Sequence, residues 1–140
     1  MPLKILFADD SAADRLILKS MLPDYDVVTA VDGTDALRQI REQPDIGLVV
    51  LDLNMPNQNG FQVLSTLRAE DRLNRLRTIL LTSSDEPENE IRGLQLGAAD
   101  YIRKPLQRDA LRAGIKTHTD LLQIQQALEQ KLQTQGRHMN

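Results

Sequence analysis

The chain of 140 residues lacks cysteine altogether, which excludes disulfides, cysteine-ligated zinc and thiol nucleophiles. It has no apolar run near the roughly 20 residues that a membrane span requires, and its start turns acidic too soon for a signal peptide. The formal net charge of −3 leaves no basic footprint for nucleic acid. Aromatic side chains are few, with two Phe and two Tyr. We therefore expect a cytoplasmic protein of one domain, without direct nucleic-acid or membrane partners.

Short apolar runs alternate along the chain with segments whose apolar residues recur at helical spacing. This pattern predicts strands at residues 4–8, 25–31, 46–51, 77–82 and 100–104. It predicts helices at residues 15–22, 35–40, 61–70 and 90–97, and a long last helix from about residue 108. Five such strand–helix units indicate an α/β fold, a doubly wound five-stranded parallel sheet with helices on both faces.

The helix predicted at residues 90–97 has clear signals at both ends. A Ser or Asp in the stretch 83–90 is expected to cap its start, with Pro87 in the first turn. Gly97 is expected just after its end, in the position that favours a left-handed backbone.

Four of the five predicted strands, the first, third, fourth and fifth, are followed or ended by charged or hydroxyl side chains. In chain order they are Asp9 and Asp10, Asp52, Thr82 and Ser83, and Lys104. Ligands bind at this carboxyl edge of doubly wound sheets. Three carboxylates brought together there would repel one another unless a cation lay among them, and Mg²⁺ prefers such oxygen ligands. The pattern predicts a magnesium site with a lysine and a hydroxyl beside it.

Each of these residues also has an ordinary structural explanation. An acidic pair after a strand is most often a turn or a helix cap, Thr82 and Ser83 suit a loop, and Lys104 before a proline suits the start of a helix. Asp52 is harder to explain in this way, because it follows the apolar run at residues 48–51 and an unpaired buried charge is costly. The indication of function comes from the whole set at one edge of one sheet.

Four motifs together resemble the response-regulator receiver domain of two-component signalling. They are ADD at residues 8–10, DLNMPNQNG at 52–60, LLTSS at 80–84 and GAADYIRKP at 97–105. The resemblance covers residues 3–120. It implies the flavodoxin-like strand order 2-1-3-4-5, with a receiver domain at residues 1–120 and a C-terminal helical extension and tail at residues 121–140.

The resemblance implies a phosphorylation-dependent signalling switch. Asp52 would be the phosphoacceptor, taking a phosphoryl group from the phosphohistidine of a sensor histidine kinase or a histidine phosphotransfer protein. Mg²⁺, with Mn²⁺ as a substitute, would be held by Asp9, Asp10, Asp52 and the backbone carbonyl of Asn54. Such a domain catalyses only its own phosphorylation and dephosphorylation, so we expect no enzymatic activity on a separate substrate.

The resemblance also assigns the residues around the phosphoryl group. Lys104, Thr82 and Ser83 would bind it, Thr82 and Tyr101 would form the switch, and Asn54 and Ser84 would modulate dephosphorylation. The face formed by the fourth helix, the fifth strand and the last helix would then control a partner, dimerisation or a downstream output. Strand alternation places Arg103 on the face opposite Lys104, where we expect it to be solvated.

The last helix is expected to run from residue 108 to residue 135, further than a receiver domain needs to cover its sheet. Its apolar positions follow a partial heptad pattern, with Leu121, Ile124 and Leu128 extended by Leu122 and Leu132. This pattern favours a homodimer through the helix or a connection to an output domain, although a frayed surface helix is the alternative. We expect His118 on the outer surface of the helix and residues 136–140 to be disordered.

Other functions fit the sequence less well. A degenerate receiver that acts only as a scaffold would not need the complete acid, hydroxyl and lysine set. An aspartate-nucleophile phosphohydrolase of the haloacid dehalogenase type would have a second Asp where Asn54 stands. A nucleotide-binding module would have a glycine-rich first turn, which the stretch 8–15 lacks. Nothing in the sequence identifies the kinase, the downstream protein or the pathway.

Overall fold

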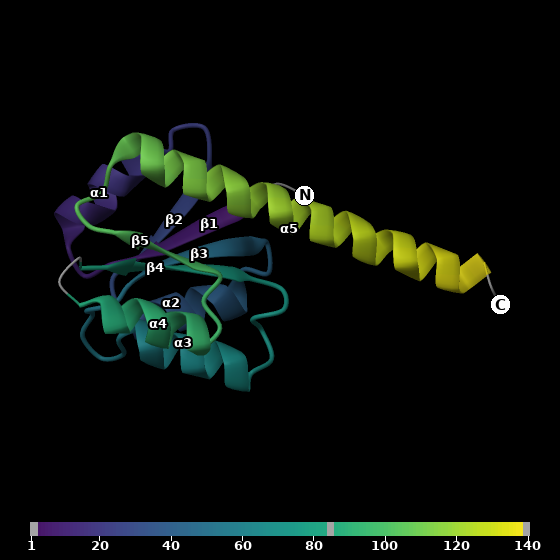
Figure 1. The fold of residues 1–140 in the computed structure, drawn as a ribbon, viewed down its shortest axis with the longest axis horizontal. Coiled ribbons are helices and arrows are strands. Elements are labelled where there is room, and N and C mark those ends of the chain that lie inside the picture. The colour runs from purple at the N-terminus through teal and green to yellow at the C-terminus, as the bar shows by residue number, and fades with distance from the viewer. Residues whose placement is uncertain (1–2, 84–85, 139–140) are drawn as a thin grey trace.

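The computed structural model describes residues 3–83 and 86–138, with side chains up to residue 134. Its centre is a parallel sheet of five strands (Figure 1). The strands are β1 (Lys4–Ala8), β2 (Asp26–Ala30), β3 (Ile46–Asp52), β4 (Arg77–Thr82) and β5 (Asp100–Arg103). They lie in the order β2-β1-β3-β4-β5, and every neighbouring pair is parallel. The predicted doubly wound, flavodoxin-like fold is confirmed.

In the described part of the chain, five helices cover the two faces of this sheet. They are α1 (Ala12–Met21), α2 (Gly33–Glu42), α3 (Gly60–Ala69), α4 (Pro87–Gln95) and α5 (Arg108–His138). In Figure 1, α1 and α5 lie on one face, and α2, α3 and α4 lie on the other. All the predicted helices are present, with ends that differ from the prediction by a few residues.

The sheet separates two apolar cores. One core joins the sheet to α1 and α5 and contains Phe7, Leu18 and Ile115. The other joins it to α2 and α3 and contains Val49 and Leu64. All seven residues of β3 are buried, since this central strand has helices on both faces. Side chains along a strand point alternately into the two cores, so a shift of one residue in the pairing of two strands would move every apolar side chain to the wrong core. The pairing register is therefore fixed, and with it the positions of the polar residues where the strands end.

The ends of α4 test the predicted caps. The residue before its first turn is Glu86, and its side chain makes no capping hydrogen bond, so the expected Ser or Asp cap is wrong. Pro87 does stand in the first turn, where the missing N–H costs least. Gly97 follows the helix with φ of 111°, and its N–H donates to the carbonyl of Leu94 at 3.1 Å. The glycine prediction is confirmed, because a left-handed residue ends the helix here.

The long helix α5 runs well past the sheet toward the C-terminus (Figure 1). It continues to His138, so the expected disorder is wrong for residues 136–138, and residues 139–140 lie outside the described part. His118 is also not on the outer surface, since only 6% of it is exposed. Residues 111, 115, 118 and 122 recur at helical spacing on the buried face, which carries the imidazole inward. Its Nε2 lies 3.0 Å from Oδ2 of Asp100.

The apolar residues near the end of α5 divide into two sets. Leu122 is buried, and a Cβ on Gly47 would lie 2.6 Å from its Cδ2, so it packs on the domain and does not extend the outer strip as expected. The exposed strip consists of Leu121, Ile124, Leu128 and Leu132. Among the described residues, none of the helices combines the length and the apolar character that crossing a membrane requires.

Candidate functional site

Three carboxylates meet at the carboxyl edge of the sheet. Asp52 is the last residue of β3, and Asp9 and Asp10 directly follow β1, whose Ala8 is in register with Leu51 of β3. Each of the three offers a carboxylate oxygen within 4.8 Å of the others. Asp9 is 1% exposed and Asp52 is 6% exposed, whereas Asp10 lies in solvent. The structure thus brings together the acidic residues that the sequence placed at this edge.

The ionised form of Asp9 is disfavoured in this cluster, so its pKa is raised. Burial, with a smaller contribution from the charge of Asp52, raises its pKa to about 6, although the N–H of Ser11 opposes this shift by donating to Oδ1 at 2.9 Å. The other oxygen, Oδ2, is buried without a hydrogen-bond partner among the described residues. A buried carboxylate oxygen that accepts no hydrogen bond, beside two further carboxylates, suits a hard divalent cation such as Mg²⁺. The residues present therefore fit the predicted metal.

Asn54 lies two residues after Asp52, in the loop at the same edge, and its side chain is exposed. Its position is compatible with the expected contribution of a backbone carbonyl, and that role stays a prediction.

Lys104 reaches this cluster from the end of β5. Its Nζ lies 3.2 Å from Oδ1 of Asp52, 3.6 Å from Oδ2 of Asp9 and 3.8 Å from Oδ2 of Asp14. Burial opposes the charge on Lys104, but the carboxylates of Asp52 and Asp9 outweigh it and raise its pKa. The ammonium group therefore stays protonated at neutral pH next to Asp52. Sequence reasoning missed Asp14, which looks like an ordinary first-turn acid of α1.

Thr82 ends β4, and it is 1% exposed. Its hydroxyl donates to Oε2 of Glu90 at 3.1 Å. Ser83 follows it and is exposed, and Ser84 lies outside the described residues. No sequence signal pointed to Glu90, because an acid near the start of a helix is common.

Arg103 holds the Glu90 carboxylate with two hydrogen bonds, from Nε at 2.8 Å and from a terminal nitrogen at 3.0 Å. Arg103 is exposed to solvent, as expected from the sequence, but the sequence did not indicate this ion pair. The side chain of Arg103 is 57% exposed, yet its guanidinium is ion-paired with Glu90.

Tyr101 lies half-buried in β5 and packs against the core on the α2 and α3 face. In the pairing of β4 with β5, Leu80 is opposite Tyr101 and Thr82 is opposite Arg103. Thr82 and Tyr101 therefore belong to adjacent strands, two positions apart in register, and alternation puts them on the same face of the sheet. Their expected roles in a switch stay predictions.

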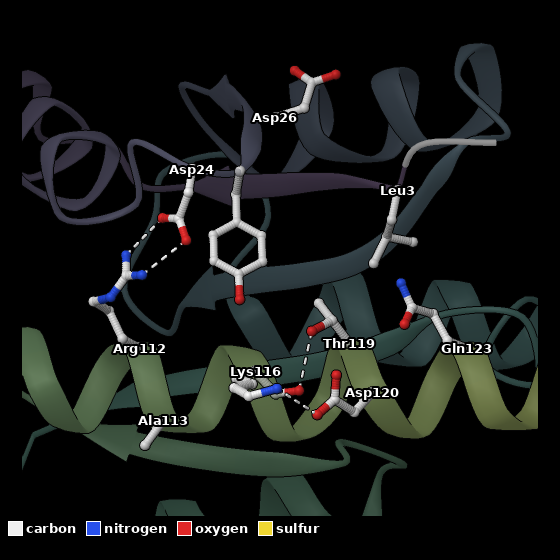
Figure 2. Close-up of a pocket in the computed structure, with 10 residues that line it drawn as sticks. Leu3, Asp24, Asp26, Arg112, Ala113, Lys116, Thr119, Asp120 and Gln123 are labelled. Atoms are coloured by element: carbon white, nitrogen blue, oxygen red, sulfur yellow. Dashed lines mark hydrogen bonds and ion pairs between the residues drawn. The ribbon is translucent and has the colours of Figure 1, made fainter.

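A second concavity lies away from these residues. A groove of about 770 Å³ lies between α5 and the start of β2, and Figure 2 shows its lining. Arg112 makes two hydrogen bonds to Asp24, and Lys116 pairs with Asp120 at 3.0 Å. Because the cations of this groove are already paired within it, the carboxylate cluster is the stronger candidate for the functional site.

Comparison with known proteins agrees with this site. The family model described as the response regulator receiver domain matches residues 5–116. The chain belongs to this family. Receiver domains are the phosphorylated modules of two-component systems. The family match and the strand order confirm the family and the fold expected from the sequence.

Individual relatives give the same result. The receiver domain is 44% identical over 117 residues to the "Probable transcriptional regulator ycf27" of Porphyridium aerugineum, covering 81% of this chain and 47% of that protein. It is 37% identical over 116 residues to the alkaline phosphatase synthesis transcriptional regulatory protein PhoP of Bacillus subtilis, with the same coverage. The solved structure of chemotaxis protein CheY4 of Vibrio cholerae has a TM-score of 0.76 and 28% identity, covering 84% of this chain and 98% of that one.

The chain spans about half the length of the curated relatives it matches. Receiver domains generally use Mg²⁺ at an acidic pocket and interact with histidine kinases or phosphotransfer proteins, and this receiver domain has the acidic cluster. The division into residues 1–120 and 121–140 stays a prediction.

Proposed function

We propose that this receiver domain is a switch that accepts a phosphoryl group on Asp52. The observation that carries the proposal is the position of the Asp52 carboxylate, which is buried at the edge of the sheet with Oδ1 3.2 Å from Nζ of Lys104. In the proposed step, a carboxylate oxygen of Asp52 forms a bond to the phosphorus of a phosphohistidine. The nitrogen–phosphorus bond breaks, its electron pair stays on the imidazole nitrogen, and that nitrogen takes up a proton.

The residues around Asp52 supply positioning and charge, which phosphoryl transfer chiefly requires. Lys104 holds a positive charge beside the carboxylate that becomes the acyl phosphate. Thr82, once its hydroxyl is released, supplies a hydrogen-bond donor. Asp9, Asp10, Asp52 and the carbonyl of Asn54 would hold Mg²⁺, which would supply positive charge to neutralise the phosphoryl oxygens.

We propose that the domain acts only on its own phosphoryl group. An aspartate-nucleophile phosphohydrolase needs a second acid near the nucleophile to protonate the leaving group, and position 54 is an Asn. A scaffold without chemistry would have no use for Lys104 placed against two carboxylates. The cytoplasmic location expected from the sequence stays a prediction.

The donor reaction can be tested without knowing the kinase. Phosphoramidate has a nitrogen–phosphorus bond like that of phosphohistidine, and incubation with it and Mg²⁺ is followed by phosphate-affinity gel electrophoresis. We expect a retarded band for the wild type and for Asp26→Asn, an exposed acid on β2, and none for Asp52→Asn. A retarded band in Asp52→Asn would show that another residue is the acceptor. Sustained hydrolysis of p-nitrophenyl phosphate would favour the phosphohydrolase instead.

We further propose that the output is contact between two copies through α5. Ala110 and Gly114 of α5 line a groove beside β5. Helical spacing puts Leu121, Ile124, Leu128 and Leu132 on the same side of the helix as Ala110 and Gly114, so the exposed apolar strip at the projecting end faces the same way as this groove. Only Glu129 and Lys131 are charged within residues 121–134, so a second copy would meet little repulsion.

A further inference from the structure

The hydroxyl of Thr82 already has a partner that competes with a phosphoryl group. A threonine hydroxyl has one hydrogen to donate. In this structure it is donated to Oε2 of Glu90 at 3.1 Å, within the buried interface of β4 and α4. The same hydrogen cannot be donated at the same time to a phosphoryl oxygen on Asp52. Engaging the phosphoryl group therefore requires the Thr82–Glu90 hydrogen bond to break.

Glu90 is held firmly in the position that accepts this hydrogen. Only 5% of the residue is exposed, which is unusual for an acid in the first turns of a helix. Arg103 donates to both of its oxygens, at 2.8 Å and 3.0 Å. These hydrogen bonds from Arg103, aided by the one from Thr82, outweigh burial and lower the pKa of Glu90. The acceptor is thus an ionised carboxylate at neutral pH, and charge-assisted hydrogen bonds are the stronger ones.

The ion pair of Arg103 with Glu90 also lies next to Tyr101, the second predicted switch residue. The guanidinium of Arg103 lies 5.8 Å from the centroid of the Tyr101 ring. The contacts therefore run without a gap from Thr82 to Glu90, to Arg103 and to Tyr101, across β4, α4 and β5. A change at the Thr82 hydroxyl alters the partner of Glu90 and, through Arg103, the surroundings of the ring.

We propose that Glu90 is a positioning residue that keeps the Thr82 hydroxyl in the resting arrangement, with Arg103 as its anchor. The strength of the Thr82–Glu90 hydrogen bond then sets part of the free-energy cost of activation, so Glu90 lowers the affinity of the domain for a phosphoryl group. This inference rests on the proposed function, because it assumes that Asp52 is the acceptor. It concerns the resting state and not the chemistry at Asp52.

The test measures binding of fluoroberyllate, a phosphoryl mimic, by isothermal titration calorimetry in saturating Mg²⁺. Glu90→Leu removes the acceptor at similar volume and is expected to bind fluoroberyllate roughly tenfold more tightly, within the range that a hydrogen bond to a charged group contributes. Glu90→Ala also lacks an acceptor and should behave alike, which keeps the test informative if the leucine variant does not fold. Glu90→Gln keeps an oxygen acceptor and should stay within about threefold of the wild type.

Three controls separate this role from a merely structural one. In a Thr82→Val background there is no hydroxyl to hold, so adding Glu90→Leu should leave the fluoroberyllate affinity unchanged. Glu88→Leu makes the same substitution at an exposed acid of α4 and should also have no effect. The affinity for Mg²⁺ alone should match the wild type in every Glu90 variant, since Glu90 is not part of the carboxylate cluster.

Tighter binding that depends on the Thr82 hydroxyl supports the inference. Unchanged or weaker binding in both Glu90→Leu and Glu90→Ala overturns it, and so does equal tightening in the Thr82→Val background. If the wild type itself fails to bind fluoroberyllate in Mg²⁺, the proposed function falls and this inference falls with it. That outcome is distinct from binding by the wild type with no effect of Glu90.

Discussion

Replacement of Asp9 by Asn is expected to stabilise the metal-free protein at pH 7. Asp9 is 1% exposed, and burial together with the charge of Asp52 raises its pKa from 3.8 to about 6. A carboxyl with a raised pKa is ionised at pH 7 in both the folded and the unfolded state, but its ionised form is disfavoured in the folded one. Asparagine keeps an oxygen that can accept from the N–H of Ser11 and removes the charge.

The magnitude follows from the same values. The difference between 3.8 and about 6 corresponds to roughly 3 kcal/mol of unfolding free energy at pH 7, with 1.36 kcal/mol for each pKa unit. Loss of the attraction between Asp9 and Lys104 is already included in that value. Burial of the polar amide of asparagine offsets part of this gain, so we expect a net gain of about 2 kcal/mol, or about 4–8 °C in Tm for a domain of this size.

The pH dependence has a definite sign. The cost of ionised Asp9 is fully present above its folded pKa of about 6, and it is relieved as the pH falls toward the unfolded value of 3.8. The stability difference between Asp9→Asn and the wild type should therefore shrink by about half from pH 7 to pH 5. Saturating Mg²⁺ should reverse the order, because it stabilises the wild type more than a variant that lacks one carboxylate.

The assay is urea unfolding in a chelator at pH 7 and pH 5, repeated in Mg²⁺. The matched control is Asp14→Asn, since Asp14 also lies near Lys104, at 3.8 Å, but its side chain is 43% exposed. We expect a change below about 1 kcal/mol for this control. The reasoning is refuted if Asp9→Asn is less stable than the wild type in chelator at pH 7, or if its advantage is the same at both pH values.

Three further predictions test the packing and the projecting helix. Gly93→Ala should destabilise the fold by about 1–3 kcal/mol in urea unfolding, because the added Cβ would lie 2.1 Å from Cδ1 of the buried Leu80; an unchanged midpoint would contradict the described packing of α4. His118→Ala should cost about 1–3 kcal/mol through the lost contact with Asp100 and the space left behind, whereas a surface histidine would cost almost nothing. Leu128→Asp should abolish fluoroberyllate-induced dimerisation in sedimentation velocity while leaving phosphorylation intact; persistence of the dimer would exclude the exposed strip as the interface.

The fold was predictable because its determinants are local in the sequence. In β3, the run from Ile46 to Leu51 is apolar at every position except Gly47, which identifies a central strand covered on both faces. Once the strands are known to be parallel, their carboxyl ends must share an edge. Asp9 and Asp52 could therefore be placed together from the chain alone, although their distances and burial could not.

The contacts that were not predicted depend on the packing of elements distant in the chain. Glu90 lies on α4 and meets Thr82 and Arg103 only after α4 has packed on the sheet. No local pattern separates Glu90 from its exposed neighbour Glu88. His118 differs, because its spacing from Leu111 already placed it on the inward face of α5, and a count along that face could have found it.

The measurement that tests the central claim most directly is the intact mass of the protein after incubation with acetyl phosphate and Mg²⁺. We predict a single phosphoryl adduct on the wild type, which is lost in Asp52→Asn and lost when a chelator replaces Mg²⁺. An adduct that persists in Asp52→Asn would contradict the assignment of the acceptor. Absence of any adduct on wild-type protein that demonstrably binds Mg²⁺ would contradict the proposal that this receiver domain is a phosphorylated switch.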